Sequence, residues 1–367
     1  MRLGRRLAGS PFPYRGNSLN MFRLILAALV LFAHSWYIAG RGSGPSIQGE
    51  NLGGWAVAGF FVLSGFLITR SRLRTAPGEF LLHRIARIFP AFLVVLLVTA
   101  FVFAPIALLV EQGSLSGFLT TATTPFEYVW GNLALAIEHY DIGVTLSTVP
   151  YPGAWNGSLW TLYYEFLCYL VVWLLGGLAV FRRSPVLIAV CFAFSVAVYA
   201  AIGIATRIGL DPSFALFARL LPFFLGGSLI YFVVERIGIN RILGIASLAI
   251  SLALIALVPR WGGQLAAPFL AYGLLFLATV LPQPKWIAQN DVSYGFYIYA
   301  WPVQQLAVLA GAAALGMPVY IAITVVVTFG LAWLSWVLIE RPAMALVRPP
   351  AAPAHHDPTQ LAATPRD

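Results

Sequence analysis

The stretch RLILAALVLFAH, Arg23–His34, is apolar except for the arginine at its start and the histidine at its end. Similar apolar runs, bounded by arginine, proline or glycine, recur along the chain. Of the 367 residues, 60% are hydrophobic and 10% are charged, whereas a typical soluble domain has about 25% charged residues. The runs are about 17–25 residues long, which suits membrane-crossing helices and is too long for barrel strands. The sequence therefore predicts an all-α polytopic membrane protein.

About ten membrane-spanning helices are predicted. Their approximate ranges are 21–40, 55–70, 88–110, 157–181, 185–205, 213–234, 242–258, 264–281, 292–312 and 318–339. Most arginines fall in alternate loops, so the positive-inside rule places both termini in the cytoplasm. The formal charge of +9 reflects these loops and does not indicate a nucleic-acid partner.

The composition divides the chain into three parts. Residues 1–20 form a basic cytoplasmic segment, 21–348 a transmembrane domain, and 349–367 a disordered cytoplasmic tail rich in proline and alanine. The long segment at 111–156 is predicted to lie outside, on the side of the membrane opposite the termini. Its middle, PFEYVWGNLALAI, is apolar enough for an interfacial or re-entrant helix.

Arg23 and His34 are eleven residues apart, so a helix places them on one face, about 16 Å apart along its axis. An ionisable residue inside a membrane is costly and should face a partner or a cavity. Two interpretations of His34 are open at this point. It is either a structural histidine bonded to another helix or a general base that accepts a hydroxyl proton.

The segment RSRLRTAPGEFLLHRIARIFP is the densest positive region. Arg84 and Arg87 share one helix face at i and i+3. Positive-inside signalling explains part of this charge, and anionic membrane lipids could bind there. A guanidinium cluster of this kind also suits a phosphate-bearing ligand, with Arg70 and Arg23 assisting.

Glu165 is one of the few acids within a predicted span, in GSLWTLYYEFLCYL. It is either a salt-bridged structural residue or a charged partner of His34 or an arginine. Arg219 is a possible partner for it, or a second ligand contact. Trp160 and Tyr164 beside it suit the membrane interface or stacking on sugar rings.

A further polar cluster, NDVSYGFYIYAWPVQQ, opens the ninth predicted span. Ser293 and Tyr294 are substrate-contact candidates, although Ser293 could simply cap the helix. Glu340 with Arg341 could simply anchor the end of the tenth span. We predict no metal site.

Seven stretches carry a resemblance to a known family. They are R-x10-H at Arg23–His34, GFFVLSGFLITR at Gly59–Arg70, HRIARIFPAF with Arg84 and Arg87, GSLWTLYYE at Gly157–Glu165, RLLPFFLGG at Arg219–Gly227, VSYGFYIYAWPV at Val292–Val303 and IERPAMAL at Ile339–Leu346. In this order they resemble the acyltransferase-3 family of bacterial membrane O-acyltransferases, which includes O-antigen, exopolysaccharide and Nod-factor acetylases.

The resemblance implies a ten-helix enzyme of the bacterial inner membrane (EC 2.3.1.-). Such an enzyme moves an acyl group, most often acetyl from cytoplasmic acetyl-CoA, to a hydroxyl of a cell-surface or lipid-linked carbohydrate. Four residues match positions that are regarded as essential in the family: Arg23, His34, Arg84 and Arg87. Ala300 departs from the family, which often has a histidine there.

Some members append a periplasmic esterase-like domain, so the resemblance implies that this chain acts alone or with a separate periplasmic partner. On this reading His34 and Glu165 are catalytic. The alternative is a transporter or flippase that uses the same charges to line a passage, against which no repeat symmetry is visible. A scaffold would leave the intramembrane charges without a purpose.

Overall fold

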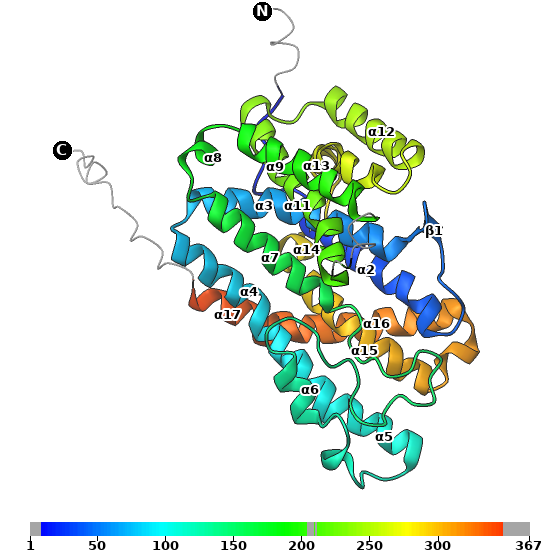
Figure 1. Ribbon diagram of the computed structural model, residues 1–367. Helices are drawn as coiled ribbons and strands as arrows, with labels where there is room; N and C mark the ends of the chain where they lie inside the picture. Colours follow the sequence, from blue (N-terminus) through cyan, green and yellow to red (C-terminus); the bar gives the residue numbers. More distant parts are fainter. Residues whose placement is uncertain (1–8, 204–208, 210, 348–367) are drawn as a thin grey trace, which may run out of the picture.

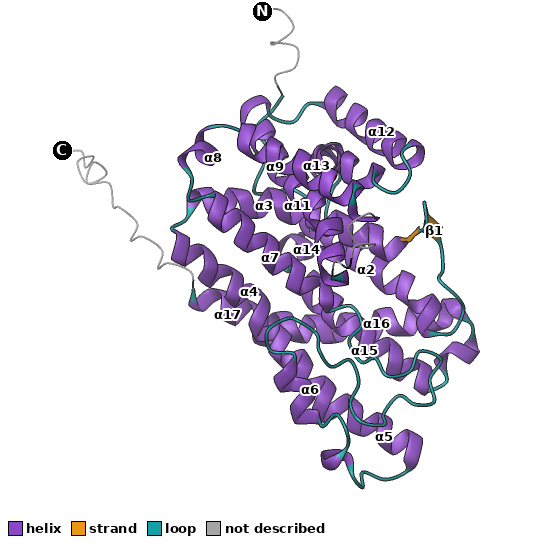
Figure 2. Ribbon diagram, in the orientation of Figure 1, coloured by secondary structure: helices purple, strands orange, loops and turns teal. Residues whose placement is uncertain are grey.

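The structure is a computed structural model that describes residues 9–203, 209 and 211–347. The predicted tail at 349–367 and the first eight residues of the basic segment lie outside the described residues. The described chain is almost wholly helical (Figure 2). Its one sheet is a hairpin in which β1 (Ser46–Ile47) pairs antiparallel with β2 (Glu50–Asn51).

The helices follow one another along the chain with short connections, except for one long irregular segment (Figure 1). They are α2 (Leu19–Ile38), α3 (Leu52–Arg74), α4 (Pro77–Val98), η1 (Thr99–Phe103), α5 (Ala104–Gln112), η2 (Phe118–Thr120), α6 (Pro125–Gly131), α7 (Trp160–Leu175), α8 (Ala179–Arg183), α9 (Val186–Ala200), α11 (Pro212–Ile237), α12 (Arg241–Leu257), α13 (Gly262–Val280), α14 (Lys285–Gln289), α15 (Ser293–Leu309), η3 (Ala312–Leu315), α16 (Met317–Ser335), η4 (Trp336–Glu340) and α17 (Arg341–Leu346).

Six helical segments within the described residues are long and apolar enough to cross a membrane. They are Leu19–Ile38, Leu52–Arg74, Pro77–Gln112, Pro212–Ile237, Gly262–Val280 and Met317–Leu346. Shorter apolar helices α7, α9 and α12 lie among them. Each of the ten predicted ranges overlaps a helix, so the expectation of a multi-pass, all-α membrane protein is confirmed.

Helix α3 lies at the centre of the bundle and packs closely on α11. Small residues bring the two backbones together: a Cβ on Gly65 would collide with the carbonyl oxygen of Phe224, and one on Gly227 with that of Val62. Ser228 adds a hydrogen bond from its hydroxyl to the Gly65 carbonyl, at 3.3 Å. Close approach through small residues is the usual packing device between helices in a bilayer, where lipid is as apolar as leucine.

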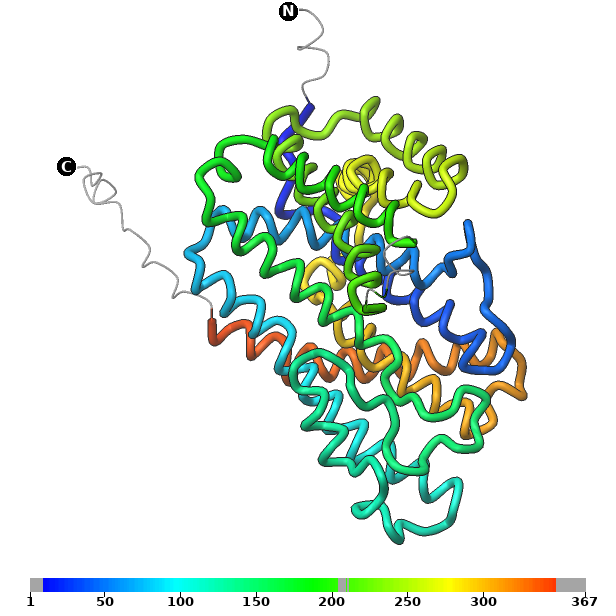
Figure 3. The backbone as a smooth tube through the Cα atoms, viewed as in Figure 1, coloured from blue at the N-terminus to red at the C-terminus, as the bar shows by residue number. Residues whose placement is uncertain are grey.

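Two ends of the bundle can be distinguished. Helix α4 begins where α3 ends, at the same end as α17 (Figure 3). At the opposite end, the hairpin leads into the first turn of α3. These two ends hold the two halves of the candidate site.

The segment between α5 and α7 differs from the prediction. Helix α6 covers only Pro125–Gly131, where Thr124 and Glu127 form a capping box, so the LALAI part of the expected interfacial helix is not helical. The chain turns at Leu135 with φ +65° and then folds back irregularly. Buried Trp155 donates to the Thr145 hydroxyl at 2.8 Å within this stretch, and the Trp301 indole of α15 donates to the Ala154 carbonyl at 2.8 Å, which ties the stretch to the bundle.

Candidate active site

Arginines and carboxylates from four parts of the chain meet at the end of the bundle near α17. Asp291, in the loop before α15, accepts from Arg23 of α2 at 2.5 Å and from Arg87 of α4 at 2.6 Å. Arg87 also reaches Glu340, at the end of η4, at 3.3 Å. The predicted cluster of free cations is therefore largely an ion-pair network.

Burial makes this network obligatory. The Glu340 side chain is 1% exposed and the Asp291 side chain 13%, so each needs a cationic partner. Burial alone would raise the pKa of the Asp291 carboxyl, but the guanidinium groups of Arg23 and Arg87 hold that pKa below its usual range. The Ser293 hydroxyl also donates to Asp291 at 2.5 Å, so Ser293 is tied to the network.

A cavity of about 410 Å³ adjoins the network. Its polar wall contains Arg23, Arg87 and Asp291, together with His83 and Arg84 of α4. Among the described residues, Arg84 has no ion-pair partner, and its buried Nε has no hydrogen-bond partner. Arg84 is thus the cation of this wall that remains available to an anionic ligand.

A smaller chamber of about 40 Å³ lies next to this cavity, and Arg23 lines both. Glu165, Ser293 and Tyr294 line the chamber with it, so four of the predicted site residues converge there. Glu165 accepts hydrogen bonds from the Ser64 and Tyr169 hydroxyls, each at 2.7 Å.

His34 lies beyond the chamber, towards the other end of α2, and lines neither cavity. Its ring packs edge-on against Trp301, with centroids 4.9 Å apart, and in a tilted arrangement against Tyr37, with centroids 5.4 Å apart. Tyr151, from the long irregular segment, contacts both of these rings. Within the described chain, the buried Nδ1 of His34 has no hydrogen-bond partner, which is costly unless a substrate or water supplies one.

Helix α3 shows how these parts are ordered. A Cβ on Gly53 would lie 3.8 Å from the His34 ring, Phe60 lines the small chamber, and Ser64 bonds to Glu165. The larger cavity begins at Leu63 and Ser64 and continues to Ile68. From Gly53 to Ser64 the helix rises about 16 Å, so the charged cavity, the chamber and His34 lie in sequence along one helix.

Two predicted pairings are wrong. Glu165 forms its hydrogen bonds with Ser64 and Tyr169, and none of its described contacts is with His34. Arg219 forms an ion pair with Glu50, on the hairpin, and not with Glu165. Both errors arise because spacing along the sequence does not reveal which helices are neighbours.

Three further candidates lie away from the two cavities. The Arg70 guanidinium stacks on the Tyr14 ring at 3.6 Å, outside the residues that line the cavity. Trp160 packs edge-on against Tyr164, with ring centroids 5.7 Å apart, and Tyr164 stacks on Phe217. These three residues are not brought together with His34 or Glu165.

Comparison with known proteins assigns the chain to a family. Residues 17–337 match the model of a family described as an acyltransferase domain. The chain belongs to the acyltransferase-3 family. Its resemblance to that family, inferred from seven stretches, is therefore confirmed.

Two curated proteins are similar over most of their lengths. An "O-acetyl transferase" of Shigella phage Sf6 is 26% identical over 89% of this chain and 96% of its own length. "Nodulation protein 10" of Rhizobium leguminosarum bv. viciae is 28% identical over 90% of this chain and 94% of its own. No solved structure matches the chain. This acyltransferase-3 protein is a membrane O-acyltransferase, in the class EC 2.3.1.-.

Proposed function

We propose that this acyltransferase moves acetyl from cytoplasmic acetyl-CoA to a hydroxyl of a cell-surface or lipid-linked carbohydrate. It would work in the bacterial inner membrane with both termini in the cytoplasm. The relative named as an O-acetyl transferase supports acetyl as the group. The arginines on the α3–α4 connection, at the end that holds the charged cavity, support a cytoplasmic position for that end.

The observation that carries the proposal is the order of sites along α3. A cavity with an uncommitted guanidinium lies at one end, and an imidazole nitrogen without a described partner lies about 16 Å further on. The chamber lined by Arg23 and Glu165 lies between them. This order fits a donor with a multiply charged head and a long, thin acyl-carrying arm.

The donor head fits the larger cavity. Coenzyme A carries several phosphates, and Arg84 offers a cation that forms no ion pair with a described carboxylate. Arg23 and Arg87 contribute donors but already share Asp291, so their net attraction for phosphate is smaller. The flexible pantetheine arm would extend through the chamber past Glu165 towards His34.

His34 acts as the general base in this scheme. Its imidazole takes the proton of the acceptor hydroxyl as that oxygen attacks the thioester carbonyl carbon. The C–S bond then breaks, and the thiolate of CoA takes the proton from the imidazolium. Acetyl ester and free CoA are the products. A covalent acyl-histidine relay is the alternative route and would give ping-pong kinetics.

Glu165 has a positioning role in this proposal. Its carboxylate is fixed by Ser64 and Tyr169 in the wall of the chamber, which Arg23 also lines. Ser293 and Tyr294 line the same wall and contact the arm. The acceptor approaches from the side of Tyr37 and Tyr151, either directly or delivered by a separate periplasmic partner.

The test uses the sidedness of the reaction. Inverted and right-side-out membrane vesicles from the producing strain receive labelled acetyl-CoA, which cannot cross the bilayer. Inverted vesicles are expected to release CoA and to place label on the enclosed glycan, whereas right-side-out vesicles do neither. Equal labelling in both orientations, or labelled glycan without CoA release, contradicts the proposal.

A gene-deleted strain and one that produces the His34→Ala protein supply the controls. Mass spectrometry of the surface glycan identifies the acetylated hydroxyl. A pure carrier or flippase would release no CoA in any of these vesicles.

A further inference from the structure

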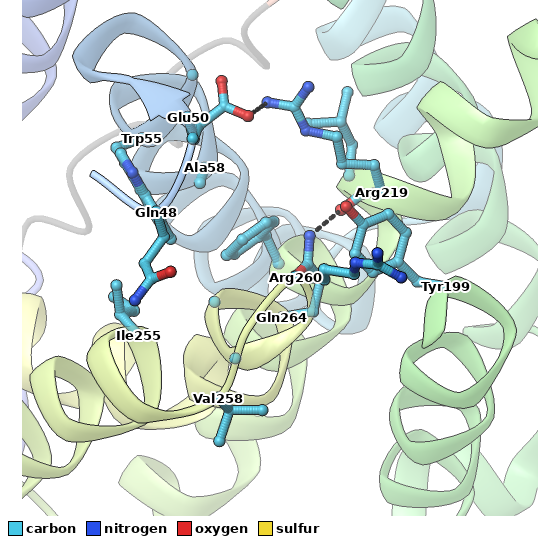
Figure 4. Close-up of a pocket in the computed structure, with 16 residues that line it drawn as sticks. Gln48, Glu50, Trp55, Ala58, Tyr199, Arg219, Ile255, Val258, Arg260 and Gln264 are labelled. Atoms are coloured by element: carbon cyan, nitrogen blue, oxygen red, sulfur yellow. Dashed lines mark hydrogen bonds and ion pairs between the residues drawn. The ribbon is translucent and has the colours of Figure 1, made fainter. Parts of the chain in front are cut away.

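A third cavity, of about 170 Å³, opens at the end of the bundle opposite the arginine network. Figure 4 shows its labelled side chains facing a common space. The first turns of α3 and α13 and the last turns of α9 and α12 contribute to its wall, as does Arg219 of α11. Five helices, of which α3 is far from the others in sequence, therefore build one polar site.

An ion pair between the hairpin and α11 fixes one side of this cavity. Glu50 pairs with Arg219, as the dashed line in Figure 4 marks. The Glu50 carboxylate lies against the first turn of α3, where a Cβ on Gly54 would collide with it. Glycine at this position thus lets the carboxylate lie directly against the helix.

Aromatic and amide groups complete the wall. The Trp55 indole donates to the Ile47 carbonyl at 3.1 Å and packs on Gly263, so its ring is held in place. Gln264 donates to the Arg219 carbonyl at 3.3 Å. Tyr199 and Arg260, the latter exposed and without an ion-pair partner among the described residues, also line the cavity.

These groups favour a neutral, hydroxyl-rich ligand. A carboxylate accepts from a hydroxyl, a guanidinium donates to one, and the flat apolar face of an aromatic ring packs on the C–H face of a sugar. For an anion such as phosphate the wall is weaker, because Glu50 already neutralises Arg219 and solvent screens the exposed Arg260 guanidinium. The mixture of donors and acceptors around an aromatic wall therefore suits a single sugar ring.

The position of the cavity relative to His34 decides which sugar it holds. Gly53, beside His34, and Ala58, in the cavity wall, are about 140° apart around α3. The two sites therefore lie on different sides of the helix, on the order of 10 Å apart. A sugar ring in the cavity is too far from His34 to be the one acetylated.

We propose that this cavity is an anchoring subsite for a neighbouring sugar of an oligomeric acceptor, which passes over the first turn of α3. This inference rests on the proposed function, because it assigns the carbohydrate acceptor to a specific place. The subsite raises the affinity for long acceptors over single sugars. The subsite takes no part in the chemical step, which depends on His34 and the residues around its ring.

The experiment compares acceptors of two lengths. Unacetylated surface polysaccharide from the gene-deleted strain is partially hydrolysed into single units and fragments of at least four units, as estimated by size. The double variant Tyr199→Leu/Arg260→Gly removes two groups without described hydrogen bonds, and glycine tolerates the φ of +71° at position 260. We expect its KM for long fragments to rise at least about fivefold.

The matched control is Arg41→Ala, which changes an exposed arginine outside the cavity and should transfer acetyl at the normal rate. The proposal is overturned if the wild-type enzyme does not prefer long fragments, or if the double variant keeps the whole preference. It is also overturned if 0.5 M NaCl alone removes the preference, because the ligand would then be an anion. Absence of transfer to either acceptor by the wild-type enzyme rejects the proposed function itself.

Discussion

The two ends of the candidate site differ in how their polar side chains are paired. Around the larger cavity, buried charges neutralise one another: Asp291 joins Arg23 to Arg87, and Arg87 joins Glu340. Around His34, the neighbours are aromatic rings, and the described residues offer no partner for its Nδ1. One end is a charged network with one cation to spare, whereas the other is a neutral cluster of aromatic rings around an imidazole.

The difference teaches how each end can act. Charges in a network hold one another in place, so the cavity keeps its shape when a phosphate-bearing head departs, and only Arg84 is then left without an ion-pair partner among the described residues. An imidazole without a partner is instead free to bond to a substrate hydroxyl. Under the proposed function, binding and chemistry are separated along α3, and variants at the two ends should fail in different ways.

The largest expected effect is at His34. His34→Ala should lower kcat for acetyl transfer about 10³-fold, because the acceptor hydroxyl loses its base. Binding of labelled acetyl-CoA to the purified protein should persist, since the charged cavity is intact. If His34→Ala stays folded but loses both acetyl-CoA binding and acetyl transfer, the two ends do not have separate roles.

The next effect concerns stability at the charged end. Asp291→Asn leaves Arg23 and Arg87 facing one another without their shared carboxylate, and should lower the free energy of unfolding by about 3 kcal/mol. Denaturant unfolding in detergent micelles measures the change.

Arg23→Gln in the same chain should recover part of that loss, because it removes the repulsion. Purely additive effects of the two substitutions would show that these three side chains are not coupled.

A smaller effect is expected for the uncommitted cation. Arg84→Gln should raise the KM for acetyl-CoA about tenfold and leave kcat within about twofold, because Arg84 binds the donor head without taking part in the chemistry. Steady-state kinetics with varied acetyl-CoA measures both constants. Arg183→Gln, at an exposed arginine of α8, is the matched control. Equal KM values for the two variants would point to lipid anchoring instead of donor binding.

The smallest expected effect is that of salt. Raising NaCl from about 0.05 to about 0.5 M should increase the KM for acetyl-CoA about threefold, because ions screen phosphate–guanidinium attraction. The KM for the acceptor should change much less, since the surroundings of His34 carry no described ion pair. If the KM for acetyl-CoA and the KM for the acceptor depended equally on salt, the two ends of the site would not differ in their electrostatics.

Much of the site could be predicted from the sequence. The spacing of Arg23 and His34 placed them along one helix, and both belong to α2. Glu165, Ser293 and Tyr294 were expected near the reaction path and line the chamber with Arg23. The role of Asp291 as the bridge between two arginines was not predicted. Asp291 lies 268 residues from Arg23, and no local pattern reports such a distance.

The sequence by itself determined the class of the protein. Apolar runs of membrane-crossing length leave helices as the only way to satisfy the backbone in lipid, and ordered motifs carry the family. Tertiary structure alone decided which charges meet: Arg219 with Glu50, Arg87 with both Asp291 and Glu340, and Glu165 with hydroxyls in place of His34. The reason is physical. Periodicity fixes the face of a helix on which a residue lies, but the packing of whole helices fixes what that face meets.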